Sequence, residues 1–298
     1  MTSRRLSVLK AHLEPNATVA KQRDDDQKRV IKIKEIENGN VAIVTIAGSM
    51  DGVPKFNQDA CVFQPNNNSL CLCDGHGNFG ELVSDIVTKC ITKNSQQNEY
   101  ANDPVKLAEA AQQAVRDNLG QAAEYSGSTG VWAVLSEDKK TLRVSNVGDS
   151  RCIVVDDAWN IIFETKDHKP DDPEELERLR KVGGRVTKRP GGVARIAGLA
   201  LSRAFGDFAA TPHGVTAIPD TTILSLEEKK PAFVMLVSDG VIDAMSSTQV
   251  VEYLRKQRQA GVKLPLALAT LVKACEEQWA IDTNEEYCDD ITCAVWLL

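Results

Sequence analysis

Three acidic turns in this chain each follow an apolar run. The runs are Leu70 to Cys73, Leu142 to Val147 and Phe233 to Val237, and the turns after them are Asp74-Gly75-His76-Gly77, Gly148-Asp149-Ser150-Arg151 and Ser238-Asp239-Gly240. Strands that stop together on carboxylates place several acid groups at one rim of a sheet. Because clustered carboxylates repel one another unless a cation lies between them, the pattern indicates a site for a hard divalent ion such as Mg²⁺ or Mn²⁺.

Length and charge exclude several classes of protein. The 298 residues suit one or two domains, and no apolar stretch approaches the roughly 20 residues that span a bilayer, so we expect no membrane association. The net charge of −7 argues against a sequence-independent nucleic-acid binder. Most of the eight cysteines lie in apolar runs without Cys-x-x-Cys spacing, which predicts reduced thiols in the cytoplasm or nucleus.

The first half of the chain alternates short strands with two helices. Residues 1–28 are polar and are predicted to be an N-terminal extension, with one domain over 29–298. Strands are predicted at 30–36, 41–48, 60–64 and 69–73, helices at 79–93 and 104–124, and further strands at 128–136, 140–147, 150–156 and 160–165. Asn38-Gly39-Asn40 is a hairpin signal, and the short links in the second block of strands predict antiparallel neighbours.

The second half begins with a helix whose ends are both marked. Asp172 and Glu175 have the spacing of a capping box, and Gly183-Gly184 ends the helix. Residues 187–220 show weak periodicity and are predicted to be a long irregular segment, which is often a functional flap. Phe233 to Val237 is predicted to be a central strand, with helices at 247–259 and 264–280 and a last strand at 291–298.

Nine short motifs, taken in order, resemble those of the metal-dependent serine/threonine protein phosphatases of type 2C. They are Asn57-Gln58-Asp59-Ala60, Cys73-Asp74-Gly75-His76-Gly77, Ser126-Gly127-Ser128-Thr129, Asn146-Val147-Gly148-Asp149-Ser150-Arg151, Asp167-His168-Lys169-Pro170, Gly183-Gly184, the segment from Leu199 to Asp207, Ser238-Asp239-Gly240 with Asp243, and Asp289-Asp290-Ile291-Thr292. No single motif is decisive, but nine in order are specific. The resemblance covers roughly residues 30–298.

The resemblance implies an α+β fold, a four-layer α-β-β-α sandwich of two antiparallel sheets flanked by helices. It also implies that Asp59, Asp74, Asp239, Asp289 and the Gly75 carbonyl hold two Mg²⁺ or Mn²⁺ ions, with Asp149 and Asp243 at a weaker third site. A hydroxide bridging the two ions would hydrolyse phosphoserine or phosphothreonine in phosphoprotein substrates. His76 is then the candidate general acid for the leaving oxygen.

One position departs from the family pattern. The family usually carries a basic, phosphate-binding residue five positions before the first metal-binding aspartate, and here that position is Pro54. Lys55 is the candidate substitute, although a lysine is a point charge and cannot grip a phosphate bidentately as an arginine does. An alternative function is therefore a family member with impaired catalysis that acts as a phosphoprotein-binding or regulatory module.

Two other phosphate chemistries fit the sequence poorly. Cysteine-based phosphatases need an arginine six residues after the nucleophile, and none of the eight cysteines has one there. A phospho-accepting receiver domain uses clustered aspartates and Mg²⁺, but it is much shorter and alternates strands with helices.

We expect a monomeric enzyme.

Overall fold

Alternate residues of the central strands face two different apolar interiors. In the computed structural model, which describes residues 29–298, β16 (Pro231–Val237) turns Phe233 and Met235 towards helices and Val234 and Leu236 towards a second sheet. Because side chains alternate along a strand and both faces are covered, this strand is apolar throughout, as predicted. The predicted polar extension, residues 1–28, lies outside the described residues.

Two antiparallel sheets form the centre of the molecule. The first has the order β1-β2-β18-β16-β10-β11, with bounds β1 (Lys32–Ile36), β2 (Val41–Ile46), β18 (Ile291–Leu297), β16 (Pro231–Val237), β10 (Arg151–Asp156) and β11 (Ile161–Glu164). The second sheet has the order β14-β7-β6-β8-β9-β15, and β5 pairs with β6. The bounds of its strands are β14 (Phe205–Gly206), β7 (Gly127–Ser128), β6 (Ser69–His76), β8 (Gly130–Leu135), β9 (Thr141–Val147), β15 (Asp220–Ser225) and β5 (Asp59–Gln64). The Asn38-Gly39-Asn40 signal lies between β1 and β2, which pair as predicted.

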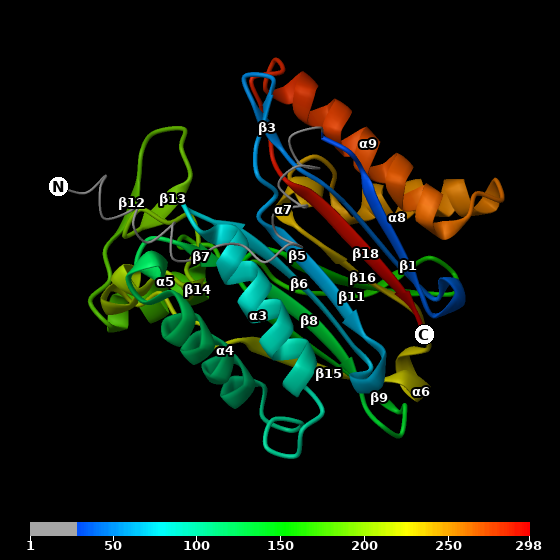
Figure 1. The fold of residues 1–298 in the computed structure, drawn as a ribbon, viewed down its shortest axis with the longest axis horizontal. Coiled ribbons are helices and arrows are strands. Elements are labelled where there is room, and N and C mark those ends of the chain that lie inside the picture. The colour runs from blue at the N-terminus through cyan, green and yellow to red at the C-terminus, as the bar shows by residue number, and fades with distance from the viewer. Residues whose placement is uncertain (1–28) are drawn as a thin grey trace.

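Helices cover the outer face of each sheet (Figure 1). The α-helices within residues 29–298 are α3 (Gly80–Asn94), α4 (Pro104–Leu119), α5 (Pro173–Lys181), α6 (Leu226–Lys229), α7 (Asp239–Ile242), α8 (Ser247–Gln259) and α9 (Leu264–Asp282). α3 and α4 pack on the second sheet, and α8 and α9 pack on the first, so the fold is the four-layer sandwich that the resemblance implied. No helix in the described part of the chain is both long enough and apolar enough to cross a membrane.

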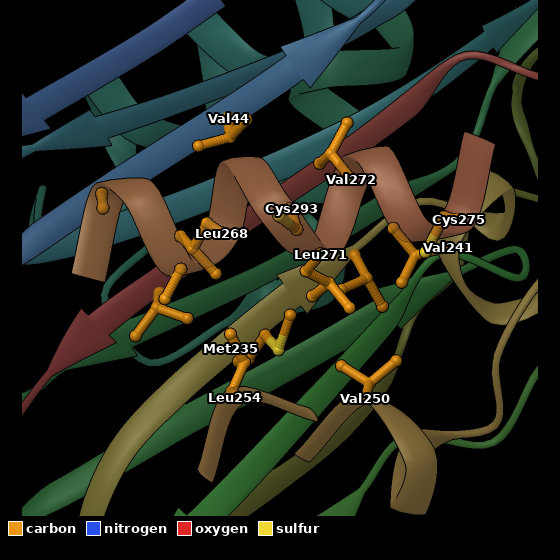
Figure 2. Packing of buried hydrophobic residues seen from close by; sticks show 14 of the residues in the cluster. Val44, Met235, Val241, Val250, Leu254, Leu268, Leu271, Val272, Cys275 and Cys293 are labelled. Carbon is orange, nitrogen blue, oxygen red and sulfur yellow. The ribbon is translucent and has the colours of Figure 1, made fainter. Parts of the chain in front are cut away.

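One face of α9 packs against the first sheet. Figure 2 shows Leu268, Leu271 and Cys275 on one side of the helix, close to Met235 of β16 and Cys293 of β18. All five side chains are fully buried. The helical spacing of these apolar residues is therefore explained by a single packed interface.

One predicted pairing is wrong. β8 pairs with β9 and β10 pairs with β11, but β9 and β10 lie in different sheets although only three residues separate them. The chain crosses between sheets at Gly148, whose φ of +99° favours glycine and whose N–H donates to His168 Nδ1 at 3.0 Å. This crossing places Asp149 at the rim that the two sheets share.

The segment predicted to be irregular contains a small hairpin. β12 (Val186–Lys188) pairs with β13 (Ala194–Ile196), and Ile196 packs with Leu179 of α5 in a separate small cluster. The predicted capping box of α5 is wrong, because Asp172 caps Glu174 N–H while the Glu175 carboxylate binds Arg178, Arg203 and Ser202 instead. A third, three-stranded sheet joins β17 (Tyr287–Cys288), β3 (Ser49–Met50) and β4 (Val53–Pro54).

Candidate active site

The first two candidate ligands lie opposite one another on neighbouring strands. Asp59 opens β5 and is the cross-strand partner of Asp74 in β6. Asp59 is 6% exposed, and Ser238 Oγ donates to its Oδ2 at 2.9 Å, whereas its Oδ1 is buried without a hydrogen-bond partner. Burial, with the nearby charge of Asp290, raises the pKa of Asp59 to about 7. An unpartnered buried carboxylate oxygen is costly, so this atom is suited to a cation or to water.

The backbone of Asp74 is locked by the Ser126–Thr129 motif. Asp74 N–H donates to Thr129 Oγ1 at 3.0 Å, and the Asp74 carbonyl accepts from Ser128 Oγ and from Thr129 N–H. The next residue, Gly75, has no room for a side chain, because a Cβ there would lie 2.2 Å from the Gly80 carbonyl oxygen. Close approach of two backbone segments thus explains the glycine and fixes the position of Asp74.

Two further carboxylates come from the first sheet. Asp239 lies two positions after the central strand β16, and Asp289 lies two positions before β18. Asp239 Oδ1 is buried without a hydrogen-bond partner. Burial raises the pKa of Asp239 well above its usual value, and the negative charges of Asp149 and Asp289 raise it further. Burial and the negative charge of Asp239 likewise raise the pKa of Asp74 well above its usual value.

These carboxylates meet at one cavity. A pocket of about 390 Å³ is lined by Asp74, Asp149, Asp239 and Asp289, together with Gly75. Asp59 lies directly behind it, close enough to raise the pKa of Asp74 by its charge. Carboxylates separated by up to 230 positions of sequence therefore converge at one rim of the sandwich.

The oxygen ligands at this cavity suit hard divalent ions, although their side chains are not already arranged around an ion position. No group of three His, Cys, Asp or Glu side chains within residues 29–298 is already arranged to hold an ion. The fit rests on chemistry: two buried carboxylate oxygens, one each from Asp59 and Asp239, lack a partner, and they lie among like charges. Such oxygens are the ligands that Mg²⁺ and Mn²⁺ prefer.

The predicted third site is only partly assembled. Lys169 Nζ forms an ion pair with Asp149 Oδ2, so a cation of the chain already occupies one side of this carboxylate. Asp243 is not among the residues that line the cavity. Burial nevertheless raises the pKa of Asp243; the positive charge of Lys169 lowers this pKa and the negative charge of Asp149 raises it. The three charged groups therefore lie close enough to affect one another.

Lys55 faces the cavity but is not a free cation. Its Nζ donates to Asp289 Oδ1 at 3.0 Å and to the Tyr287 hydroxyl at 3.1 Å, and it lies 4.7 Å from the centre of the Tyr287 ring. Burial alone would lower the pKa of Lys55, but the negative charges of Asp290 and Asp289 have the larger effect, so the pKa of Lys55 is raised. Pro54 lies in β4, paired with Ser49, and does not line the cavity.

His76 has a buried acidic partner that sequence reasoning missed. His76 Nε2 lies 2.6 Å from Asp207 Oδ2, and the Asp207 side chain is 3% exposed. Gly127 packs against both, since a Cβ there would lie 2.0 Å from Asp207 Oδ2 and 2.7 Å from His76 Nε2. The position of Asp207 at the end of the Leu199–Asp207 motif was the available signal, but nothing local connects it to a histidine 131 positions away.

Two more residues of the site were not singled out from the sequence. Asp290 is buried and accepts from Gly48 N–H at 2.6 Å and from Gln58 N–H at 3.0 Å, so it ties the segment before β5 to the start of β18. Arg195 of the β13 strand lines the cavity from the predicted flap, and its Nη1 donates to the Gly198 carbonyl at 2.7 Å. The flap thus contributes one wall of the site.

Comparisons with known proteins find similar chains. The family model described as protein phosphatase 2C matches residues 44–284, well over half of the chain. The chain is 32% identical over 277 residues to probable protein phosphatase 2C 72 of Arabidopsis thaliana, covering 82% of each protein. It is 34% identical over 185 residues to human protein phosphatase 1G, covering 57% of this chain but only 32% of that protein.

A solved structure shares the fold. The structure of a serine-threonine phosphatase 2C from Toxoplasma gondii superposes with a TM-score of 0.64 and 23% identity. The match covers 89% of this chain and 98% of that one. At this identity the likeness concerns the arrangement of the sheets and helices.

Proposed function

This chain belongs to the protein phosphatase 2C family, and we propose on that basis that it hydrolyses phosphoserine and phosphothreonine in proteins with the help of two Mg²⁺ or Mn²⁺ ions. The observation that carries the proposal is the convergence of Asp74, Asp239 and Asp289 at one cavity, with Asp59 as the cross-strand partner of Asp74. Carboxylates this close, two of them with an unpartnered buried oxygen, need a positive charge between them.

The proposed ligands of the two ions are Asp59, Asp74, Asp239, Asp289 and the carbonyl oxygen of Gly75. Divalent ions at such a site lower the pKa of bound water and screen the charge of a phosphate dianion. Asp149 and Asp243, with Asp239, are the proposed ligands of a weaker third ion. That ion would compete with Lys169, which already pairs with Asp149.

His76 is the proposed general acid. A serine or threonine oxygen is a poor leaving group, so it needs a proton as the bond to phosphorus breaks. Because Nε2 of His76 is bound to Asp207, Nδ1 is the nitrogen that would give the proton to the leaving oxygen. Asp207 is proposed to fix the tautomer and orientation of the ring, as carboxylate partners of histidine commonly do.

Lys55 is the proposed phosphate-binding cation in place of the usual basic residue at position 54. An ammonium group has three donors, and Asp289 and Tyr287 take two of them. The third donor is available for a phosphate oxygen in the cavity that Lys55 lines.

We also infer a single catalytic domain over residues 29–298 and a reducing compartment, the cytoplasm or nucleus. The proposed ligands run from position 59 to position 289, so the site needs nearly the whole described chain. All eight cysteines are free, and the sulfur atoms of Cys71 and Cys73 are 3.8 Å apart.

A phosphate-release assay tests the function. The purified protein with Mn²⁺ should release phosphate from a phosphothreonine peptide, and EDTA should stop the release. Asp239→Asn should reduce turnover sharply, whereas Asp157→Asn, the same change at an exposed position at the far end of β10, should not. If the metal-loaded wild-type protein releases no phosphate from any phosphopeptide or from p-nitrophenyl phosphate, the proposal is wrong.

A further inference from the structure

The hairpin beside the cavity is strongly basic in an otherwise acidic chain. Residues 185–195 contain Arg185, Lys188, Arg189 and Arg195 and no acidic residue, although the chain as a whole carries a net charge of −7. Figure 1 shows β12 and β13 in a loop that extends from the end of the sandwich near β7. This hairpin is the part of the flap that contributes Arg195 to the cavity wall.

The pairing of the hairpin places Arg195 on its outer face. Ala194 and Ile196 are buried on the inner face, where Ile196 packs in the small cluster around Leu179, so Arg195 points the other way. Thr187 is the cross-strand partner of Arg195. Arg185 and Arg189 flank β12, and all three arginines of the hairpin are exposed.

The positive charges on this face are not neutralised within the described residues. Lys188 forms an ion pair with Asp171 at 2.8 Å, but none of the ion pairs within residues 29–298 involves Arg185, Arg189 or Arg195. Of the two cations that line the cavity, Lys55 is held by Asp289, whereas Arg195 is held only by a carbonyl oxygen. Arg195 is therefore the cavity cation that has no acidic partner within the described residues.

We propose that the basic β12–β13 hairpin makes this enzyme select phosphoproteins with acidic residues next to the phosphorylated serine or threonine. The inference rests on the proposed function, because it concerns the peptide whose phosphate enters the cavity. An extended peptide advances about 3.3 Å per residue, so residues flanking the phosphorylated one pass beside the cavity wall. Aspartate and glutamate side chains there meet Arg195 first and the other two arginines beyond it. Charge complementarity of this kind discriminates between partners more than it raises overall affinity.

Three substrates test the inference. Two phosphothreonine peptides share a centre and carry either Asp and Glu or Lys and Arg at the flanking positions, and p-nitrophenyl phosphate has no flanks. With Mn²⁺ present, we expect kcat/KM for the acidic peptide to exceed that for the basic peptide about tenfold, mainly through KM. The ratio should shrink in high salt, which screens exposed charges.

Charge reversal identifies the residues responsible. Arg195→Glu should lower the acidic-to-basic ratio about tenfold, and adding Arg185→Glu and Arg189→Glu should lower it further. The matched control is Arg258→Glu: Arg258 is also exposed and donates to a backbone carbonyl, that of Val262, at 2.8 Å, but it lies on α8 over the other sheet. This control should leave the ratio unchanged, and circular dichroism confirms that each variant is folded.

The outcomes separate the two proposals. Equal kcat/KM for the two peptides in the wild-type protein, or an acidic preference that survives all three arginine reversals, overturns the inference while the phosphatase assignment stands. Failure to turn over all three substrates overturns the proposed function and the inference with it.

Discussion

Replacing Asp207 with asparagine tests whether this residue acts through His76. The change keeps the size of a side chain that is 3% exposed and packed against Gly127, but it removes the negative charge 2.6 Å from His76 Nε2. A hydrogen bond that involves a charged group contributes about 1.5–3 kcal/mol. If that energy serves to orient His76, the proposed general acid, kcat should fall about 10- to 150-fold, since 1.36 kcal/mol is a factor of ten.

The leaving group makes the assay selective. p-Nitrophenolate leaves without a proton, so Asp207→Asn should slow hydrolysis of p-nitrophenyl phosphate much less than hydrolysis of a phosphothreonine peptide. Both rates are measured with saturating Mn²⁺, so that a change in metal affinity does not contribute. A merely structural role for Asp207 would lower both rates alike.

A double-mutant cycle gives the result that would refute the reasoning. If Asp207 works only through His76, its replacement should have no effect on kcat for the peptide once His76 is alanine. A further loss of tenfold or more in the His76→Ala, Asp207→Asn double variant would show that Asp207 acts by another route.

Three more predictions follow from the contacts. Gly127→Ala should reduce peptide turnover at least as much as Asp207→Asn, because its Cβ would lie 2.0 Å from the Asp207 carboxylate; unchanged kinetics would contradict this. Glu175→Gln should destabilise the protein by about 3–5 kcal/mol in urea unfolding at pH 7, by leaving two arginines under-compensated. Burial alone would raise the pKa of Glu175, but Arg178 and Arg203 have the larger effect and hold this pKa below its usual value. The carboxylate therefore stabilises the protein above about pH 4.3. The difference in free energy of unfolding between the wild-type protein and Glu175→Gln should narrow as the pH falls below that value. Mn²⁺ should raise the thermal midpoint of the wild-type protein, while Asp239→Asn should raise the metal-free midpoint by relieving repulsion and abolish the Mn²⁺ effect.

Much of the fold was predictable from local patterns. The apolar runs predict strands at 69–73 and 233–237, where β6 and β16 lie, and the helix predicted over 264–280 is α9. The crossing between β9 and β10 was not predictable, because a three-residue link is compatible with either a hairpin or a change of sheet. Only the packing of the second layer decides between them.

The sequence alone predicted the chemistry of the site, since Asp74-Gly75 and Ser238-Asp239-Gly240 each follow an apolar run and oxygen ligands suit a hard cation. Tertiary structure alone decided the pairings: His76 with Asp207, Lys55 with Asp289, Lys169 with Asp149. It also placed the basic hairpin at the cavity wall. The physical reason is the distance along the sequence over which each feature is specified. A strand or turn is specified by its neighbours in sequence, whereas the partner of a charged side chain depends on which distant segment the folded sheets bring within a few ångströms of it.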